Sequence, residues 1–133
     1  MGQLISTRAC VERYLAALNA GDADAVAACV TEDFHNEHTS AEGRSLRGRA
    51  AYRSRLTGFL AEFRELHYEV EDLLVDDDRA AVAYRMSFRM ADAEGREVPV
   101  RVRGMFRFEV VDGLIAHRLD YWDGTTVARQ LGR

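Results

Sequence analysis

The chain has 133 residues, the length of one compact domain, so we expect a single domain over residues 1–133. Its 18 basic residues are all arginine, and with 22 acidic residues they give a formal net charge of −4. This balance disfavours nucleic acid as a partner, and the missing lysine excludes Schiff-base chemistry, pyridoxal phosphate attachment and a P-loop. No apolar stretch approaches the roughly 18 residues of a membrane helix, so we expect a soluble, cytoplasmic protein without a membrane partner.

Helical periodicity dominates the first half of the chain. Apolar side chains recur at helical spacing over residues 4–20 and again over residues 49–63. Asp22 is expected to cap a second, short helix over residues 23–30. A brief extended segment over residues 34–39 should follow that helix.

After residue 63 the pattern changes to the strict alternation of half-buried strands. The expected strands are residues 66–70, 82–90, 98–110 and 114–123, followed by a short helix over residues 125–131. Three helices followed by long antiparallel strands predict an α+β fold. Strands of this length twist and curve, so we expect a cone-shaped, mostly antiparallel sheet packed against the three N-terminal helices. Its apolar concave face could hold a small hydrophobic ligand.

Strand alternation places one acidic side chain on this apolar face. The inward-facing residues expected to line the site are Tyr84, Met86, Phe88, Val102 and Phe106. If the last hairpin keeps its pairing, Arg118, Asp120 and Trp122 also point inward. Burial raises the pKa of an unpaired carboxyl group, which makes Asp120 a candidate proton donor or acceptor. The alternative is a structural ion pair of Asp120 with Arg118, or with Arg85 if a bulge turns that strand over.

Three further polar residues are candidates for the same cavity. Asn36 and His38 share one face of the short first strand, so they can point together toward a ligand. His38 is either a second proton carrier or a hydrogen-bonded structural histidine. Tyr14 lies on the apolar stripe of the first helix, where it is either a core aromatic residue or a hydrogen-bond donor to a ligand oxygen.

The remaining histidines do not form a recognisable metal-binding pattern. His35 and His117 lie on the outward-facing parity of their strands, and His67 begins a strand. The spacing from His35 to His38 is not that of a helical ligand pair, so we expect no bound metal.

The opposite face of the sheet is expected to be charged. Arg101, Arg103 and Arg107 face outward on one strand, with Glu69 and Glu71 on a neighbouring strand. We expect cross-strand ion pairs there rather than an anion-binding patch. An outer sheet face of this kind also suits a twofold contact, so we expect a homodimer through it.

Two segments of the chain resemble known families. The run Arg13–Asp22, followed by Thr31–Phe34, resembles the opening of the bacterial ketosteroid isomerases. The tail, Asp112–Asp123 with Arg129–Gly132, is similar to limonene-type epoxide hydrolases and SnoaL-like polyketide cyclases. All three belong to the nuclear transport factor 2-like superfamily, whose fold is an α+β cone. This fold hosts isomerases, cyclases, hydrolases and plain binding modules, so the resemblance implies the fold more strongly than one activity.

The isomerase resemblance assigns roles to three positions. Tyr14 matches the tyrosine that stabilises an oxyanion, and His38 stands where the isomerases have a carboxylate base. Gly104 stands where they have a protonated aspartate, which argues against steroid isomerisation.

The other two families emphasise the last strand. Asp120 and Arg85 match an aspartate and an arginine of the epoxide hydrolases, but Ser87 replaces their second aspartate. The SnoaL-like cyclases rely mainly on one acidic residue near the end of the last strand, which is Asp120 or Asp123, and we favour Asp120.

These observations lead to two hypotheses. The first is a cofactor-independent enzyme of the SnoaL-like type that performs cyclase or isomerase chemistry on a small hydrophobic oxygenated molecule. Asp120, His38 and Tyr14 would be its catalytic residues. The second is a non-catalytic module that binds a small molecule or a partner with the same fold.

Overall fold

The computed structural model describes residues 4–41 and 43–133. Three helices precede most of the sheet: α1 (Thr7–Ala20), α2 (Ala23–Ala27) and α3 (Arg49–Glu62). The Ser6 side chain caps α1 by accepting the N–H of Ala9, and Gly21 ends it in the left-handed conformation with φ 66°. A short helix, α4 (Gly124–Gln130), follows the last strand.

Six strands form one mixed sheet. They are β1 (Val30–His38), β2 (Leu46–Arg47), β3 (Arg64–Asp76), β4 (Arg79–Ala91), β5 (Glu97–Val111) and β6 (Leu114–Trp122). The strand order is β2-β1-β6-β5-β4-β3, with all neighbours antiparallel except β1 and β6, which run parallel. The sheet is therefore not closed, because β2 and β3 form its two edges. The α+β class, the three N-terminal helices and the short C-terminal helix are confirmed.

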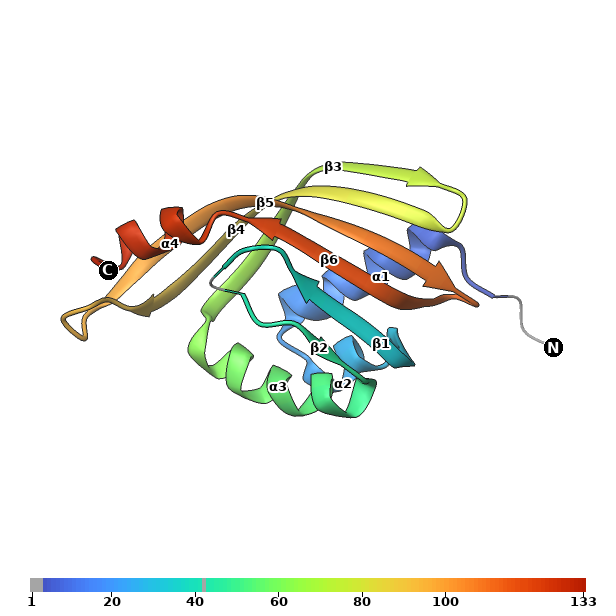
Figure 1. Ribbon diagram of the computed structural model, residues 1–133, viewed down its shortest axis with the longest axis horizontal. Coiled ribbons are helices and arrows are strands. Elements are labelled where there is room, and N and C mark those ends of the chain that lie inside the picture. The colour runs from blue at the N-terminus through green and yellow to red at the C-terminus, as the bar shows by residue number, and fades with distance from the viewer. Residues whose placement is uncertain (1–3, 42) are drawn as a thin grey trace.

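The long strands bend, and the helices lie against the sheet. Figure 1 shows α1 running along one face of the sheet, α2 and α3 next to β1 and β2, and α4 near the far end of β4 and β5. Even-numbered side chains of β4 and β5 fill the face toward α1, and the buried ones include Val82, Tyr84, Phe88, Phe106 and Phe108. Packed aromatic side chains therefore occupy much of the concave face.

Several predicted boundaries are wrong: β1 begins at Val30 rather than residue 34, and β3 spans Arg64–Asp76 rather than residues 66–70. The second helix ends at Ala27 rather than residue 30, and Val30 already belongs to β1. Val30 is fully buried and pairs with Ile115 of β6, whose N–H also donates to the carbonyl of Cys29. Strand pairing of a β-branched residue therefore outweighs the local helical pattern. In the part of the chain that the structure describes, no helix has the length and apolar character needed to span a membrane.

Candidate functional site

The parallel pairing of β1 with β6 brings the polar candidates together. Asn36 lies opposite Arg118, and His38 lies opposite Asp120. Because side chains alternate along a strand, both pairs point to the inner face of the sheet. Among the described residues, Asn36, Arg118 and Asp120 are the polar or charged residues, tyrosines aside, that are fully buried. Such groups require hydrogen-bond partners, and the structure supplies them.

The Asp120 carboxyl group is held by a tyrosine. Its Oδ1 accepts a hydrogen bond of 2.6 Å from the Tyr84 hydroxyl group. The main-chain carbonyl of Asp120 accepts hydrogen bonds of 3.1 Å from both the N–H and the hydroxyl of Thr39. Burial raises the pKa of the Asp120 side chain, while the charge of Arg118 and the Tyr84 hydrogen bond act in the opposite direction. The carboxyl group therefore favours its neutral, protonated form more than an exposed aspartate does.

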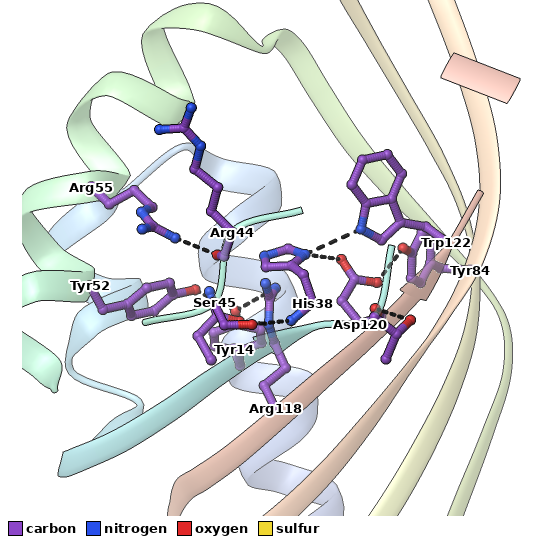
Figure 2. A network of polar contacts seen from close by, with 12 residues as sticks. Tyr14, His38, Arg44, Ser45, Tyr52, Arg55, Tyr84, Arg118, Asp120 and Trp122 are labelled. Atoms are coloured by element: carbon purple, nitrogen blue, oxygen red, sulfur yellow. Dashed lines mark hydrogen bonds and ion pairs between the residues drawn. The ribbon is translucent and has the colours of Figure 1, made fainter. Parts of the chain in front are cut away.

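His38 is a neutral neighbour of this carboxyl group. Figure 2 shows its ring facing both Trp122 and Asp120, and the Trp122 indole N–H donates to His38 Nδ1 at 3.2 Å. An indole nitrogen can only donate, so Nδ1 carries no proton and the hydrogen of the ring is on Nε2. Burial, followed by the charges of Arg118 and Arg55, lowers the pKa of His38 from 6.5 to about 3.

The contact between His38 and Asp120 is therefore not an ion pair at neutral pH. Their nearest atoms, Nδ1 and Oδ2, are 3.7 Å apart, which is too long for a hydrogen bond. Because Nδ1 carries no proton and already accepts from the Trp122 indole, His38 donates no hydrogen bond to Oδ2 that would stabilise a negative charge there. Ser45 fixes the backbone of His38 by accepting its N–H at 3.1 Å.

Arg118 forms a second buried cluster beside Asp120. Its Nε–H donates to Asn36 Oδ1 at 2.9 Å, and Nη1–H donates to the Tyr14 hydroxyl at 3.0 Å. Tyr14 in turn shares a hydrogen bond of 2.5 Å with the Tyr52 hydroxyl group. The guanidinium carbon lies 4.8 Å from the centre of the Phe106 ring. Neutral acceptors and an aromatic face thus surround this charge, and no ion pair with a carboxylate is found for it within the described residues.

The site reaches solvent through its histidine. The His38 side chain is 18% exposed, whereas that of Asp120 is 8% exposed. Two hollows lie elsewhere on the molecule, and neither is lined by Asp120, His38 or Trp122. The larger, about 680 Å³, is lined mostly by outward-facing residues of β3, β4 and β5, and the smaller, about 260 Å³, lies between the ends of α1 and α3. The concave face beside Asp120 is largely packed with side chains.

Comparison with known proteins decides the family. A model of the SnoaL-like domain matches residues 11–118. The chain belongs to the SnoaL-like domain family. No curated protein shows significant similarity to the sequence. The nuclear transport factor 2-like fold expected from the sequence is confirmed by structural neighbours, one of them named as an NTF2-like protein.

Three solved structures illustrate the relationship. A candidate ketosteroid isomerase from Kribbella flavida is 27% identical, with a TM-score of 0.70 over 87% of this chain and 76% of that one. TsrD from Streptomyces laurentii is also 27% identical, with a TM-score of 0.74 over 94% and 93% of the two chains. An LEH-like epoxide hydrolase from M. tuberculosis is 21% identical, with a TM-score of 0.79 over 96% and 90%, and shares the fold alone.

Within this SnoaL-like domain, most of the predicted site residues form one network. The residues around the Asp120 carboxyl group are His38, Trp122 and Tyr84. The adjoining cluster consists of Arg118 and the residues that contact it, which are Tyr14, Asn36 and Phe106. Met86, Phe88 and Val102 are buried farther along the sheet, beyond the pairing of Gly104 with Trp122 near the end of β6. Ligand contact by these residues stays a prediction.

One assignment from the resemblance, that of Arg85, changes, whereas the preference for Asp120 over Asp123 agrees with the burial of the two residues. Arg85 lies on the outer face, 3.5 Å from Glu71, so it does not bridge to Asp120 as the arginine of an epoxide hydrolase would. Asp123 is the exposed N-cap of α4, and the hydrogen bond from the Thr125 N–H lowers its pKa. The buried acid is therefore Asp120 rather than Asp123.

Sequence reasoning missed the donor role of Tyr84 and the participation of Tyr52. Tyr84 pairs with Gly104 across the hairpin, and a Cβ atom at Gly104 would lie 2.4 Å from the Tyr84 hydroxyl oxygen. The hydroxyl thus occupies the space that a side chain at position 104 would fill. A glycine that pairs with an aromatic residue across two strands was the sequence feature that could have indicated this close approach. The Tyr14–Tyr52 contact joins helices 38 positions apart, and no local pattern indicates it.

Proposed function

We propose that this SnoaL-like domain is a cofactor-independent enzyme that moves protons on a small hydrophobic oxygenated molecule, in cyclase or isomerase chemistry. The observation that carries the proposal is the buried Asp120 carboxyl group, whose pKa is raised by burial and whose Oδ1 is held by Tyr84. Perturbed carboxyl groups of this kind are typical of general acids and bases. Structural neighbours named as cyclase, isomerase and epoxide hydrolase support an enzyme of this family.

The proton cycle follows from the hydrogen bonds. With Oδ1 accepting from Tyr84, Oδ2 carries the proton and donates it to a substrate oxygen. The resulting carboxylate is stabilised by the Tyr84 hydroxyl and by the nearby charge of Arg118, and it then removes a proton from a carbon of the same substrate. Cyclisation and double-bond migration leave the substrate's atoms unchanged, so one group that gives and regains a proton is sufficient.

His38 and Tyr14 have supporting roles in this cycle. With a pKa of about 3, His38 stays neutral and serves as a hydrogen-bond donor through Nε2 rather than as a proton carrier. Tyr14 is fully buried and contacts Arg118 and Tyr52, so it is a positioning residue for the guanidinium group. This role differs from the oxyanion donor implied by the isomerase resemblance.

Replacement of Asp120 tests the proposal. The purified protein is first assayed with a β,γ-unsaturated ketone, a terpene epoxide, a polyketide ester and any compound extracted from it and identified by mass spectrometry. With a converted compound, D120N should lose activity by about 10²–10⁴-fold, because asparagine cannot exchange a proton. The Kd for that compound should change little, and the matched variant D123N should retain full activity. Turnover by D120N at the wild-type rate would contradict the proposal.

A non-catalytic binding module is the second candidate. Its supporting observation is that Gly104 lacks the side chain found in the isomerases and that the Tyr84 hydroxyl fills the space. This candidate predicts that a co-purified apolar compound is retained tightly and recovered unchanged after prolonged incubation.

A further inference from the structure

We propose that His35, Glu37 and His117 form a binding site for a divalent transition-metal ion, such as Zn²⁺, on the outer face of β1 and β6. The same parallel pairing that points His38 and Asp120 inward places His35 directly opposite His117 on the other face. The proposal is therefore independent of the acid–base site.

The three side chains already converge. The rings of His35 and His117 stack with centres 4.6 Å apart and planes 10° from parallel. Glu37 Oε1 lies 3.0 Å from His117 Nε2 and 4.0 Å from His35 Nδ1. One ligand atom from each residue lies within 4.8 Å of the others.

These atoms suit zinc in kind and spacing. Two imidazole nitrogens and one carboxylate oxygen are a common ligand set for Zn²⁺ with an open position for water. Bonds of about 2.0–2.1 Å in a tetrahedral site place ligand atoms roughly 3.4 Å apart. The ligand atoms are close to this spacing, and binding would rotate the two rings out of their parallel stack, so that the in-plane lone pair of each faces the ion.

A second carboxylate, that of Glu109, faces the other ring nitrogen of His117. Its Nδ1 lies 3.4 Å from Glu109 Oε2, and Glu109 is the residue of β5 paired with His117. A ligating histidine usually presents its other ring nitrogen to a carboxylate, which leaves the first nitrogen free to bind the metal. Without an ion, a proton on Nε2 makes the hydrogen bond to Glu37, and the metal would replace that proton.

Charge and access also favour the site. Glu37 and Glu109 together balance a divalent ion, while Arg47, paired with His35 across β1 and β2, adds a positive charge that weakens binding. The side chains of His35, Glu37 and His117 are 23%, 38% and 21% exposed, so an ion can enter from solvent.

Titration with metal ions tests the proposal. The full chain is titrated with Co²⁺, followed by its visible absorption bands, and with Zn²⁺ by calorimetry, and one ion per chain is expected. H35N, E37Q and H117N should each weaken binding at least 10-fold, and E109Q by about 10-fold or more because its role is to orient His117. H67N, which changes an exposed histidine of β3, should bind as the wild type does.

Two results would overturn the site. One is the absence of a stoichiometric Co²⁺ spectrum, and the other is wild-type affinity in both E37Q and H117N, which would assign the ion to an adventitious surface position. Circular dichroism confirms that each variant is folded, and E37Q changes the most exposed of the three ligands, so it preserves the test if a histidine variant fails to fold.

Discussion

The protonation of Asp120 and His38 has opposite consequences for stability. Burial raises the pKa of Asp120, so the folded chain holds this proton more tightly than the unfolded chain does. The stabilisation from that proton is present at low pH and is lost as pH rises through the folded-state pKa. The pKa of His38 is lowered from 6.5 to about 3, so the contribution of His38 to the free energy of unfolding increases as the pH rises between these values. The two effects partly cancel in the wild-type protein.

Replacing Asp120 should separate these effects. Asparagine carries no charge, so D120N lacks the cost of ionising a buried carboxyl group. We expect the free energy of unfolding of D120N, relative to wild type, to increase as the pH rises above about 4. The limiting slope is about 1.4 kcal/mol per pH unit, measured by urea denaturation at each pH. D123N is the control with the opposite sign, because hydrogen bonds lower the pKa of Asp123. A pH-independent difference for D120N would contradict a raised pKa.

Among the secondary-structure elements, the hairpins could be predicted, whereas the pairing of β1 with β6 could not. The alternation along β4 and β5 is local, and Asp112 with Gly113 marks the turn between β5 and β6. Both the strands and their inward faces therefore follow from the sequence. The partners His38 and Asp120 lie far apart in the chain, and no short-range pattern relates β1 to β6. The polar network and the His35–His117 cluster depend on that pairing, so the sequence indicated single residues but not their contacts.

The close pairing of β4 with β5 at Gly104 also predicts the effect of a small substitution. In G104A the new Cβ would lie 2.4 Å from the Tyr84 hydroxyl oxygen and 2.7 Å from the Tyr121 carbonyl oxygen. The Tyr84 ring is fixed against Tyr68 and Phe106, so it cannot move away easily. We expect a loss of about 1–3 kcal/mol in the free energy of unfolding, together with a weakened Tyr84–Asp120 hydrogen bond.

A second glycine provides the matched control for that measurement. Gly58 lies within α3, and a Cβ there meets nothing within 4 Å. G58A should therefore stabilise the protein by about 0.5–1 kcal/mol, because alanine favours the helix. Chemical denaturation of both variants gives the comparison, and a G104A protein as stable as wild type would show that Tyr84 does not need this space.

In the molecule as a whole, one sheet separates two kinds of chemistry. Its inner face holds the buried Asp120, and its outer face holds the histidine cluster and the cross-strand ion pairs expected from sequence. Glu71 pairs with Arg103 through two hydrogen bonds of 2.9 Å and with Arg85 at 3.5 Å, which confirms the expectation of ion pairs there. The arginines of this face are therefore partly neutralised, and an outer surface of paired charges and apolar side chains is compatible with a protein contact.

We also propose that the homodimer contact predicted from the sequence lies on the outer face, over the middle of β5 and the C-terminal end of β6. Met105 and Tyr121 are paired across these strands and are 43% and 41% exposed, an unusual exposure for large apolar side chains placed side by side. A twofold contact would cover the pair in both chains. Light scattering coupled to gel filtration should give twice the chain mass for wild type and the single-chain mass for M105D and Y121D. A16D places the same charge on an exposed position of α1 and should remain dimeric. A monomeric wild type, or dimers that persist in both sheet variants, would contradict this contact.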